Sequence, residues 1–146
     1  MPAMNKDTPH IEAEEDLTQR RIRSYVLRQG RLTKGQEKAL ADHWPTFGID
    51  YTPETLDLAK TFGRQNSLKI LEIGFGMGET TASIAQSMPE RDFLGVEVHT
   101  PGVGGLLKLI GEKSLSNVRI IQHDVVDVLN HMIADASLDG VHIFLP

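Results

Sequence analysis

Four short apolar segments alternate with three helix-like segments in the second half of the chain, and this alternation restricts the fold more than any other feature. The apolar segments have the length of buried strands and span Leu68–Ile73, Phe93–Val98, Val118–Gln122 and Leu138–Leu145. The helical patterns between them span Glu79–Met88, Thr100–Lys113 and Val125–Ala134. Strands that alternate with helices predict an α/β fold with a parallel sheet and right-handed crossovers.

The whole chain is predicted to hold three parts of different character. Residues 1–16 are polar and acidic and are expected to be disordered. Residues 17–64 are expected to form a basic N-terminal extension with short helices. Residues 65–146 contain the alternating pattern and form the α/β part.

Local signals place two short helices in the extension. Thr33 with Gln36 three residues later matches a capping box. It predicts a helix over residues 34–44, which the turn-rich segment 45–54 follows because Pro45 disfavours a longer helix. A second short helix is expected over Thr55–Phe62.

Charge is distributed unevenly, although the 146 residues have a net charge of only −5. Residues 17–40 hold seven Lys and Arg residues against one Glu, whereas residues 65–146 carry an excess of acids. Such a basic block is either a solvated surface or a contact for RNA phosphates. Its candidate contacts are Arg20, Arg21, Arg23, Arg28, Arg31 and Lys34, with Tyr25 as a side chain that can stack on a base.

Composition excludes several classes of protein. The chain has no Cys, which rules out disulfides and thiolate metal sites and fits a reducing cytosol. Its acidic N-terminus does not resemble a signal peptide, and no apolar run approaches the ~18 residues of a membrane span. His123 and His131 lack the spacing of metal ligands. We therefore expect a cytoplasmic protein without a metal or a membrane contact.

The sequence EIGFGMG at Glu72–Gly78 places glycines at every second position between the first predicted strand and the helix that follows. A dinucleotide fingerprint needs a third glycine where Glu79 stands, and that carboxylate would oppose a pyrophosphate at the helix N-terminus. The Gly-Lys-Ser/Thr of a phosphate-binding loop is absent too. The remaining pattern, E-x-G-x-G-x-G, resembles motif I of class I S-adenosylmethionine (SAM) methyltransferases. A generic tight turn with a surface Glu is the alternative.

Two further acids follow the next two predicted strands. Glu97 stands where an acid accepts hydrogen bonds from both ribose hydroxyls of an adenosine. Asp124 stands where this fold commonly places an acid near the adenine amino group. Each alone is more often a solvated loop residue, but three acids at the ends of three successive strands favour SAM as the cofactor. The expected binding residues are Glu72, Gly74, Gly76, Glu97 and Asp124.

Two longer stretches carry a more specific resemblance. SYVLRQGRLTKGQEKAL at Ser24–Leu40 with HWPTFGI at His43–Ile49, and GVEVHTPGVGGLL at Gly95–Leu107, are similar to the bacterial tRNA (guanine-N7)-methyltransferase family. The resemblance implies a Rossmann-like class I SAM-dependent methyltransferase fold, tRNA as the partner, and methyl transfer from SAM to N7 of the variable-loop guanine at tRNA position 46. The family's SAM contacts include acids that match Glu72, Glu97 and Asp124.

The resemblance also implies that part of the family pattern lies beyond the last residue. In the family, the fourth of these strands is followed by Asp-Pro-Trp, whose aspartate is the proposed catalytic residue, and that aspartate would directly follow Pro146. We therefore expect a fragment in which the C-terminal part of the sheet is missing and no catalytic residue is present. Such a fragment is expected to be a monomer, weakly stable and inactive by itself, because a sheet cut at one edge exposes an apolar strand.

Several alternatives remain open. Gly102, Gly104 and Gly105 fit either a helix that starts late or a backbone that closely approaches adenosine or RNA. His99 is either a polar loop residue or a ligand contact. The rival functions are a catalytically inactive SAM- or RNA-binding fragment, an NAD-type oxidoreductase and a small-molecule methyltransferase. Glu79 argues against the oxidoreductase, and the basic block argues against the small-molecule enzyme.

Overall fold

The structure is a computed structural model that describes residues 31–144. The expected disorder of residues 1–16, the basic residues from Arg20 to Arg28 and the candidate stacking residue Tyr25 lie outside the described residues. The division of the chain into three parts therefore stays a prediction.

Five parallel strands form one sheet in the order β1-β4-β3-β2-β5. They span Gly48–Ile49 (β1), Lys69–Ile73 (β2), Asp92–Val96 (β3), Val118–Ile121 (β4) and Gly140–Ile143 (β5). The predicted α/β fold with a parallel sheet is confirmed. Strands β2, β4 and β5 fall within their predicted segments, and β3 starts one residue before its predicted segment. The three inner strands are largely apolar on both faces, as expected for a sheet that is covered on both sides.

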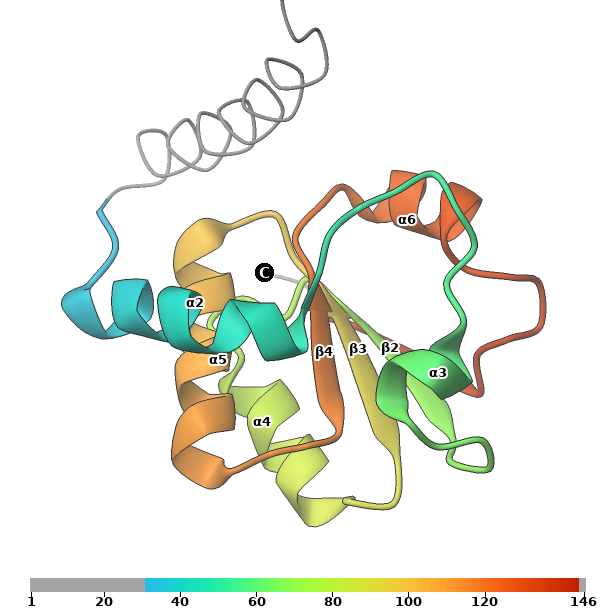
Figure 1. The fold of residues 1–146 in the computed structure, drawn as a ribbon, viewed down its shortest axis with the longest axis horizontal. Coiled ribbons are helices and arrows are strands. Elements are labelled where there is room, and N and C mark those ends of the chain that lie inside the picture. Colours follow the sequence, from blue (N-terminus) through green and yellow to red (C-terminus); the bar gives the residue numbers. More distant parts are fainter. Residues whose placement is uncertain (1–30, 145–146) are drawn as a thin grey trace, which may run out of the picture.

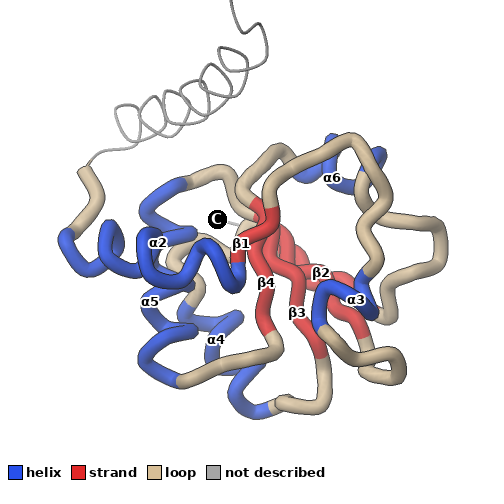
Figure 2. The backbone as a smooth tube through the Cα atoms, in the orientation of Figure 1, coloured by secondary structure: helices blue, strands red, loops and turns tan. Residues whose placement is uncertain are grey.

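Strand β1 lies in the segment that was predicted to be turns, and that prediction is wrong. β1 pairs Gly48 with Ile120 and Ile49 with Ile121 of β4 (Figure 2). A strand of two residues is too short to show an alternating pattern in the sequence. Gly48 suits the position because a Cβ there would lie 2.1 Å from the Trp44 ring.

Helices cover both faces of the sheet and give the molecule three layers (Figure 1). One face carries three helices, α2 (Lys34–Phe47), α4 (Glu79–Ser87) and α5 (Thr100–Lys113). The other face carries two shorter helices, α3 (Leu58–Phe62) and α6 (Val125–His131).

Helix α2 begins as predicted and ends later than predicted. The Thr33 hydroxyl accepts from the Gln36 backbone N–H at 3.1 Å, and the side-chain Oε1 of Gln36 accepts from the Thr33 N–H at 3.0 Å, so the capping box is confirmed. The helix then continues through Pro45 to Phe47. Proline removes only one helical hydrogen bond near this end, and the packing of Trp44 and Phe47 against the core favours the additional turn.

Two helices on the second face are shorter than predicted. α3 starts at Leu58 instead of Thr55, because the Asp57 carboxylate accepts from the Lys60 N–H at 3.1 Å and so forms the N-cap. Gly63, at φ 72°, ends it in the left-handed conformation. α6 ends at His131 instead of Ala134.

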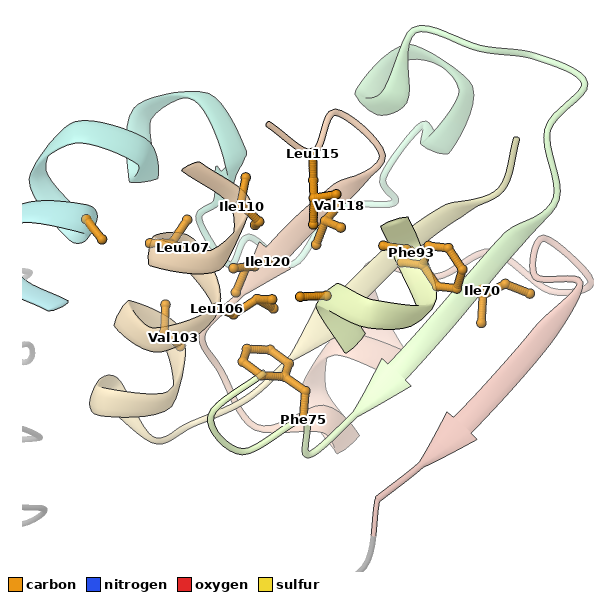
Figure 3. Packing of buried hydrophobic residues seen from close by; sticks show 13 residues of the cluster. Ile70, Phe75, Phe93, Val103, Leu106, Leu107, Ile110, Leu115, Val118 and Ile120 are labelled. Atoms are coloured by element: carbon orange, nitrogen blue, oxygen red, sulfur yellow. The ribbon is translucent and has the colours of Figure 1, made fainter. Parts of the chain in front are cut away.

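The core is divided by the sheet into two halves. The first lies between the sheet and the three longer helices and includes Phe93 of β3, Ile120 of β4, and Leu106 and Leu107 of α5 (Figure 3). The second lies under α3 and α6 and includes Leu71, Leu94 and Ile121 from the opposite faces of the same strands. Burial on both faces fixes the register of the inner strands, because a slip of one residue would exchange the two halves.

A buried ion-pair network joins the first residues of β2 and β3. The Asp92 carboxylate, with a side chain 1% exposed, accepts from Lys69 Nζ at 2.8 Å and Arg64 Nε at 3.1 Å, and the Ser67 hydroxyl donates to it as well. Burial alone would raise the pKa of Asp92, but these hydrogen bonds outweigh it and the pKa is lowered. The network fixes the amino edge of the sheet, away from the glycine loop.

We expect Asp92→Asn to lower the free energy of unfolding by about 3–5 kcal/mol, because Lys69 would remain buried without its counter-ion. Urea unfolding at pH 7 measures the change. The stabilisation by Asp92 exists above the ordinary carboxyl pKa of 3.8 and is lost as the pH falls through the lower pKa of the folded state, so the difference between the two proteins should shrink in acid.

The matched control is Asp42→Asn. Asp42 also lies 2.8 Å from a lysine, Lys38, but on the exposed surface of α2. Its loss should leave the free energy of unfolding almost unchanged, because water screens the charges of an exposed pair. Equal effects of the two substitutions would contradict a special role for the buried network.

Candidate functional site

The carboxyl ends of β2, β3 and β4 meet at one edge of the sheet. Ile73 pairs with Val96 and Val96 pairs with Ile121, so the three strands end in register. The Gly74 N–H continues the ladder to Val96 O at 2.9 Å, and the Glu97 N–H continues it to Ile121 O at 3.2 Å. The three segments that follow the strands therefore lie side by side, as the sequence predicts.

The glycine loop, residues 74–78, connects β2 to α4 with three glycines in the left-handed conformation. Gly74, Gly76 and Gly78 have φ values of 68°, 59° and 84°. A side chain at any of them would be strained. Their surroundings differ. A Cβ on Gly78 would lie 2.5 Å from Leu106, whereas a Cβ on Gly76 would have no atom within 4 Å. Gly78 therefore serves packing, and Gly76 leaves the backbone open on its outer side.

Glu97 holds the glycine loop against the end of β3. Its Oε1 accepts from the Gly76 N–H at 2.9 Å, and its Oε2 accepts from the Val98 N–H at 2.8 Å. The carboxylate thus connects two of the three segments at this edge. Because a carboxylate oxygen accepts more than one hydrogen bond, both oxygens retain capacity for a ligand.

The glycines at the start of α5 lie against the glycine loop and α2. The predicted late start of the helix is wrong, whereas an approach of this backbone to adenosine or RNA stays a prediction. The helix starts at Thr100, before the glycines. A Cβ on Gly102 would lie 2.1 Å from Gly76 O, and one on Gly105 would lie 2.9 Å from Met77 O. On α2, Gln36 lies 2.9 Å from the Cβ position of Gly104. These glycines let α5 approach both the glycine loop and α2.

Glu72 is the least expected member of the site, because its side chain is 0% exposed. It lies in β2 between Gly95 of β3 and His142 of β5. His142 Nδ1 is 3.3 Å from Glu72 Oε1, yet neither carboxylate oxygen has a hydrogen-bond partner among residues 31–144. Burial raises the pKa of Glu72, and the nearby imidazole opposes this shift.

Asp124 follows β4 and lies on the surface. Its Oδ1 accepts from the Val126 N–H at 2.8 Å, which makes Asp124 the N-cap of α6. Gln122, two residues earlier, donates to Val98 O at 3.2 Å and to the Thr100 hydroxyl at 2.8 Å, so the segment after β4 is tied to the segment after β3.

The structure therefore brings all five predicted site residues to one edge of the sheet, in different environments. Glu72 is buried, Glu97 is half-buried and Asp124 and Gly76 are exposed, with Gly74 between these extremes. Exposed apolar side chains follow the same three strands at Met77, Val98 and Val126. Acids beside apolar surface suit a ligand that combines positive charge with an aromatic ring.

Sequence reasoning missed two groups of residues near this edge. His142 beside Glu72 depends on the pairing of β5 with β2, which no local pattern encodes. The Tyr51 ring stacks on His123 and the Tyr51 hydroxyl contacts His131, although the sequence analysis considered these histidines only as metal ligands. No group of three or more His, Cys, Asp or Glu side chains within residues 31–144 is placed to hold a metal ion.

Three other candidate residues from the sequence lie before or at the start of helices α2 and α5. His99 precedes the first residue of α5 and makes no capping hydrogen bond with its side chain. Arg31 and Lys34 are exposed at the start of α2, while the remaining basic residues lie outside the described part of the chain. No helix in that part is both long enough and apolar enough to span a membrane.

Comparison with known proteins connects this geometry to methyltransferases. Residues 66–146 match the model of a family described as "Putative methyltransferase". A protein of Methylobacillus flagellatus named tRNA (guanine-N(7)-)-methyltransferase is 68% identical over 133 residues, 91% of this chain and 56% of that protein. The protein of the same name from Chromobacterium violaceum is 58% identical over 133 residues, 91% of this chain and 58% of that protein.

A solved structure of lower similarity, described as a putative methyltransferase from Thermoplasma acidophilum, has a TM-score of 0.46 and 23% identity over 63% of this chain and 41% of that chain. The present chain spans little more than half the length of the two curated relatives.

We expect Gly102→Ala to lower the free energy of unfolding by about 1–3 kcal/mol, because the new methyl group would force α5 away from the glycine loop. Gly35→Ala in α2 is the matched control, since its methyl group would meet only the flexible Lys108 side chain at 3.4 Å. The control should be neutral or stabilising by up to about 1 kcal/mol. Urea unfolding compares the two variants. Equal destabilisation by both would contradict a close approach of α5 to the glycine loop.

We expect Glu72→Gln to raise the free energy of unfolding at pH 8 by about 1–2 kcal/mol, because it removes a buried charge without hydrogen-bond partners. The pKa of Glu72 is raised in the folded state, so its charge destabilises the fold increasingly as the pH rises above the ordinary value of 4.5. The two proteins should have similar stability below that pH. Glu112→Gln, at an exposed position of α5, is the control and should change stability little at any pH.

Proposed function

The chain belongs to the methyltransferase family whose model residues 66–146 match, and we propose that it forms the SAM-binding part of a tRNA (guanine-N7)-methyltransferase. The observation that carries the proposal is the glycine loop, held open at Gly76 by the Glu97 carboxylate. The names of the two curated relatives support guanine N7 in tRNA as the acceptor.

The residues at the carboxyl edge fit SAM better than a phosphate-bearing nucleotide. Three carboxylates follow or end neighbouring strands, and Glu79 adds a fourth at the start of α4. This charge suits a ligand with ammonium and sulfonium groups and opposes a pyrophosphate. The two orphaned oxygens of Glu72 provide an independent sign, since a buried carboxylate without hydrogen bonds is stabilised by a cation nearby.

Each site residue has a distinct part in this proposal. The Glu97 carboxylate accepts from the ribose hydroxyls while it keeps the loop in place, and Gly74 and Gly76 let the backbone approach the amino-acid end of SAM. Glu72 supplies negative charge below that end. Asp124 retains one oxygen beyond its helix cap, which accepts from the adenine amino group.

Methyl transfer to guanine N7 depends more on the positioning of the two reactants than on acid–base catalysis. SAM supplies an electrophilic methyl group on its sulfonium. Guanine N7 carries a lone pair and no proton, so no side chain is needed to create the nucleophile. The residues of this chain contribute by fixing the methyl donor in a single orientation. This lowers the activation barrier, because less entropy is then lost on reaching the transition state.

Titration of the chain with S-adenosylhomocysteine in a calorimeter tests the proposal. We expect one site per chain and no heat from NADH under the same conditions. Glu97→Gln should weaken binding at least about tenfold, because a charge-assisted acceptor is replaced by a neutral one. Glu90→Gln is the control, since that exposed side chain follows α4 at the opposite edge of the sheet. Binding of NADH, or none of S-adenosylhomocysteine, would contradict the proposal.

Incubation with SAM and tRNA, followed by nucleoside mass spectrometry, tests the acceptor. The appearance of 7-methylguanosine from the variable loop supports the proposed reaction. Methylation of another atom would contradict it. Binding of S-adenosylhomocysteine without transfer would retain the SAM-binding part of the proposal and exclude turnover by this chain alone.

A further inference from the structure

Helix α6 carries Asp124 at its N-cap but has few contacts of its own with the core. It has seven residues, of which Val128 is buried, while Val126 and Leu129 are 59% and 41% exposed. A helix of this length is not stable by itself in water. Contacts from neighbouring segments must therefore fix its position, and they fix the Asp124 carboxylate at the same time.

Tyr51 contacts the segment at both ends of α6. It lies two residues beyond β1. Its ring stacks on the imidazole of His123, the residue before Asp124, with ring centroids 3.7 Å apart and planes 4° from parallel. Its hydroxyl lies 2.7 Å from Nδ1 of His131, the last residue of the helix, and forms a hydrogen bond with it.

Two further contacts make this arrangement a connected unit. His123 Nε2 donates to Asp127 Oδ2 at 2.9 Å within the first turn of α6, and the Leu56 N–H donates to Met132 O at 2.8 Å just beyond the last turn. Partial burial and the charge of Asp127 raise the pKa of the Tyr51 hydroxyl above its ordinary value of 10.0, and the hydroxyl is protonated at neutral pH in either case. One side chain thus spans α6 along its length.

We propose that Tyr51 is a positioning residue that sets the orientation of Asp124 toward the adenine amino group. The inference rests on the proposed function, since it concerns the same SAM site. It assigns to Tyr51 a role in choosing the base of the nucleoside, because Asp124 discriminates by hydrogen bonding. Tyr51 acts only through His123 and His131 and does not itself touch the nucleoside.

The test compares two ligands in a calorimeter, S-adenosylhomocysteine and S-inosylhomocysteine, in which a carbonyl oxygen replaces the amino group. The unaltered chain should prefer the first by at least about tenfold, because a carboxylate accepts from an amino group and repels a carbonyl oxygen. In Tyr51→Leu, which removes the ring stack and the hydroxyl, S-adenosylhomocysteine should bind about tenfold more weakly and the inosyl ligand should change little. The preference should therefore nearly disappear.

Two milder variants keep the inference testable if Tyr51→Leu does not fold. Tyr51→Phe retains the stack and His131→Ala removes the same hydrogen bond from the other side. Each should lower the preference by about two- to threefold, and the double variant should be no worse than either single one. Lys38→Ala, in the exposed pair on α2, is the control and should leave the preference unchanged.

The outcomes separate the inference from the proposed function. If the unaltered chain binds neither ligand, the proposed function fails and the inference fails with it. If the unaltered chain prefers S-adenosylhomocysteine and the Tyr51 variants show the same preference, or lose affinity for both ligands equally, only the inference is overturned. Equal losses would mean that Tyr51 supports the fold without orienting Asp124.

Discussion

The contact between the backbone of the glycine loop and the first turn of α5 determines how this edge of the sheet is built. Gly102 lies so close to the Gly76 carbonyl that no side chain fits between them, and Gly105 has the same relation to Met77. The Glu97 carboxylate completes the arrangement from β3. Because two segments meet here without intervening side chains, the loop has little freedom, and its open outer side is presented in one conformation.

Each edge of the sheet has a buried carboxylate, and the two carboxylates differ in how far their oxygens are satisfied by hydrogen bonds. Asp92 at the amino edge is surrounded by Lys69, Arg64 and Ser67, which satisfy its oxygens. Glu72 near the carboxyl edge is equally buried and has only the His142 imidazole at 3.3 Å. The first arrangement stabilises the fold. The second leaves a buried carboxylate without hydrogen-bond partners among the described residues, and perturbed carboxylates are common at functional sites.

Local sequence patterns were sufficient for most of the fold and for the expectation that the candidate site residues lie at one edge of the sheet. The alternation of strands and helices, the Thr33 capping box and the E-x-G-x-G-x-G pattern are all encoded within a few residues, and the structure contains each of them. The family resemblance predicts a specific reaction, methyl transfer to guanine N7 in tRNA, whereas the geometry alone does not specify the acceptor. Prediction failed where tertiary contacts decide, as in the two-residue β1 and the extension of α2 through Pro45. The contacts of Glu72 with His142 and of His123 with Tyr51 depend on strand order and loop packing, which no local pattern contains.

The close fit of α5 between its neighbours has a mechanical consequence. Gly102 and Gly104 are two residues apart on one helix, and they contact the glycine loop and Gln36 of α2 respectively. The helix therefore lies tightly between α2 and the glycine loop, and a displacement of α2 toward α5 would meet little free space at Gly104.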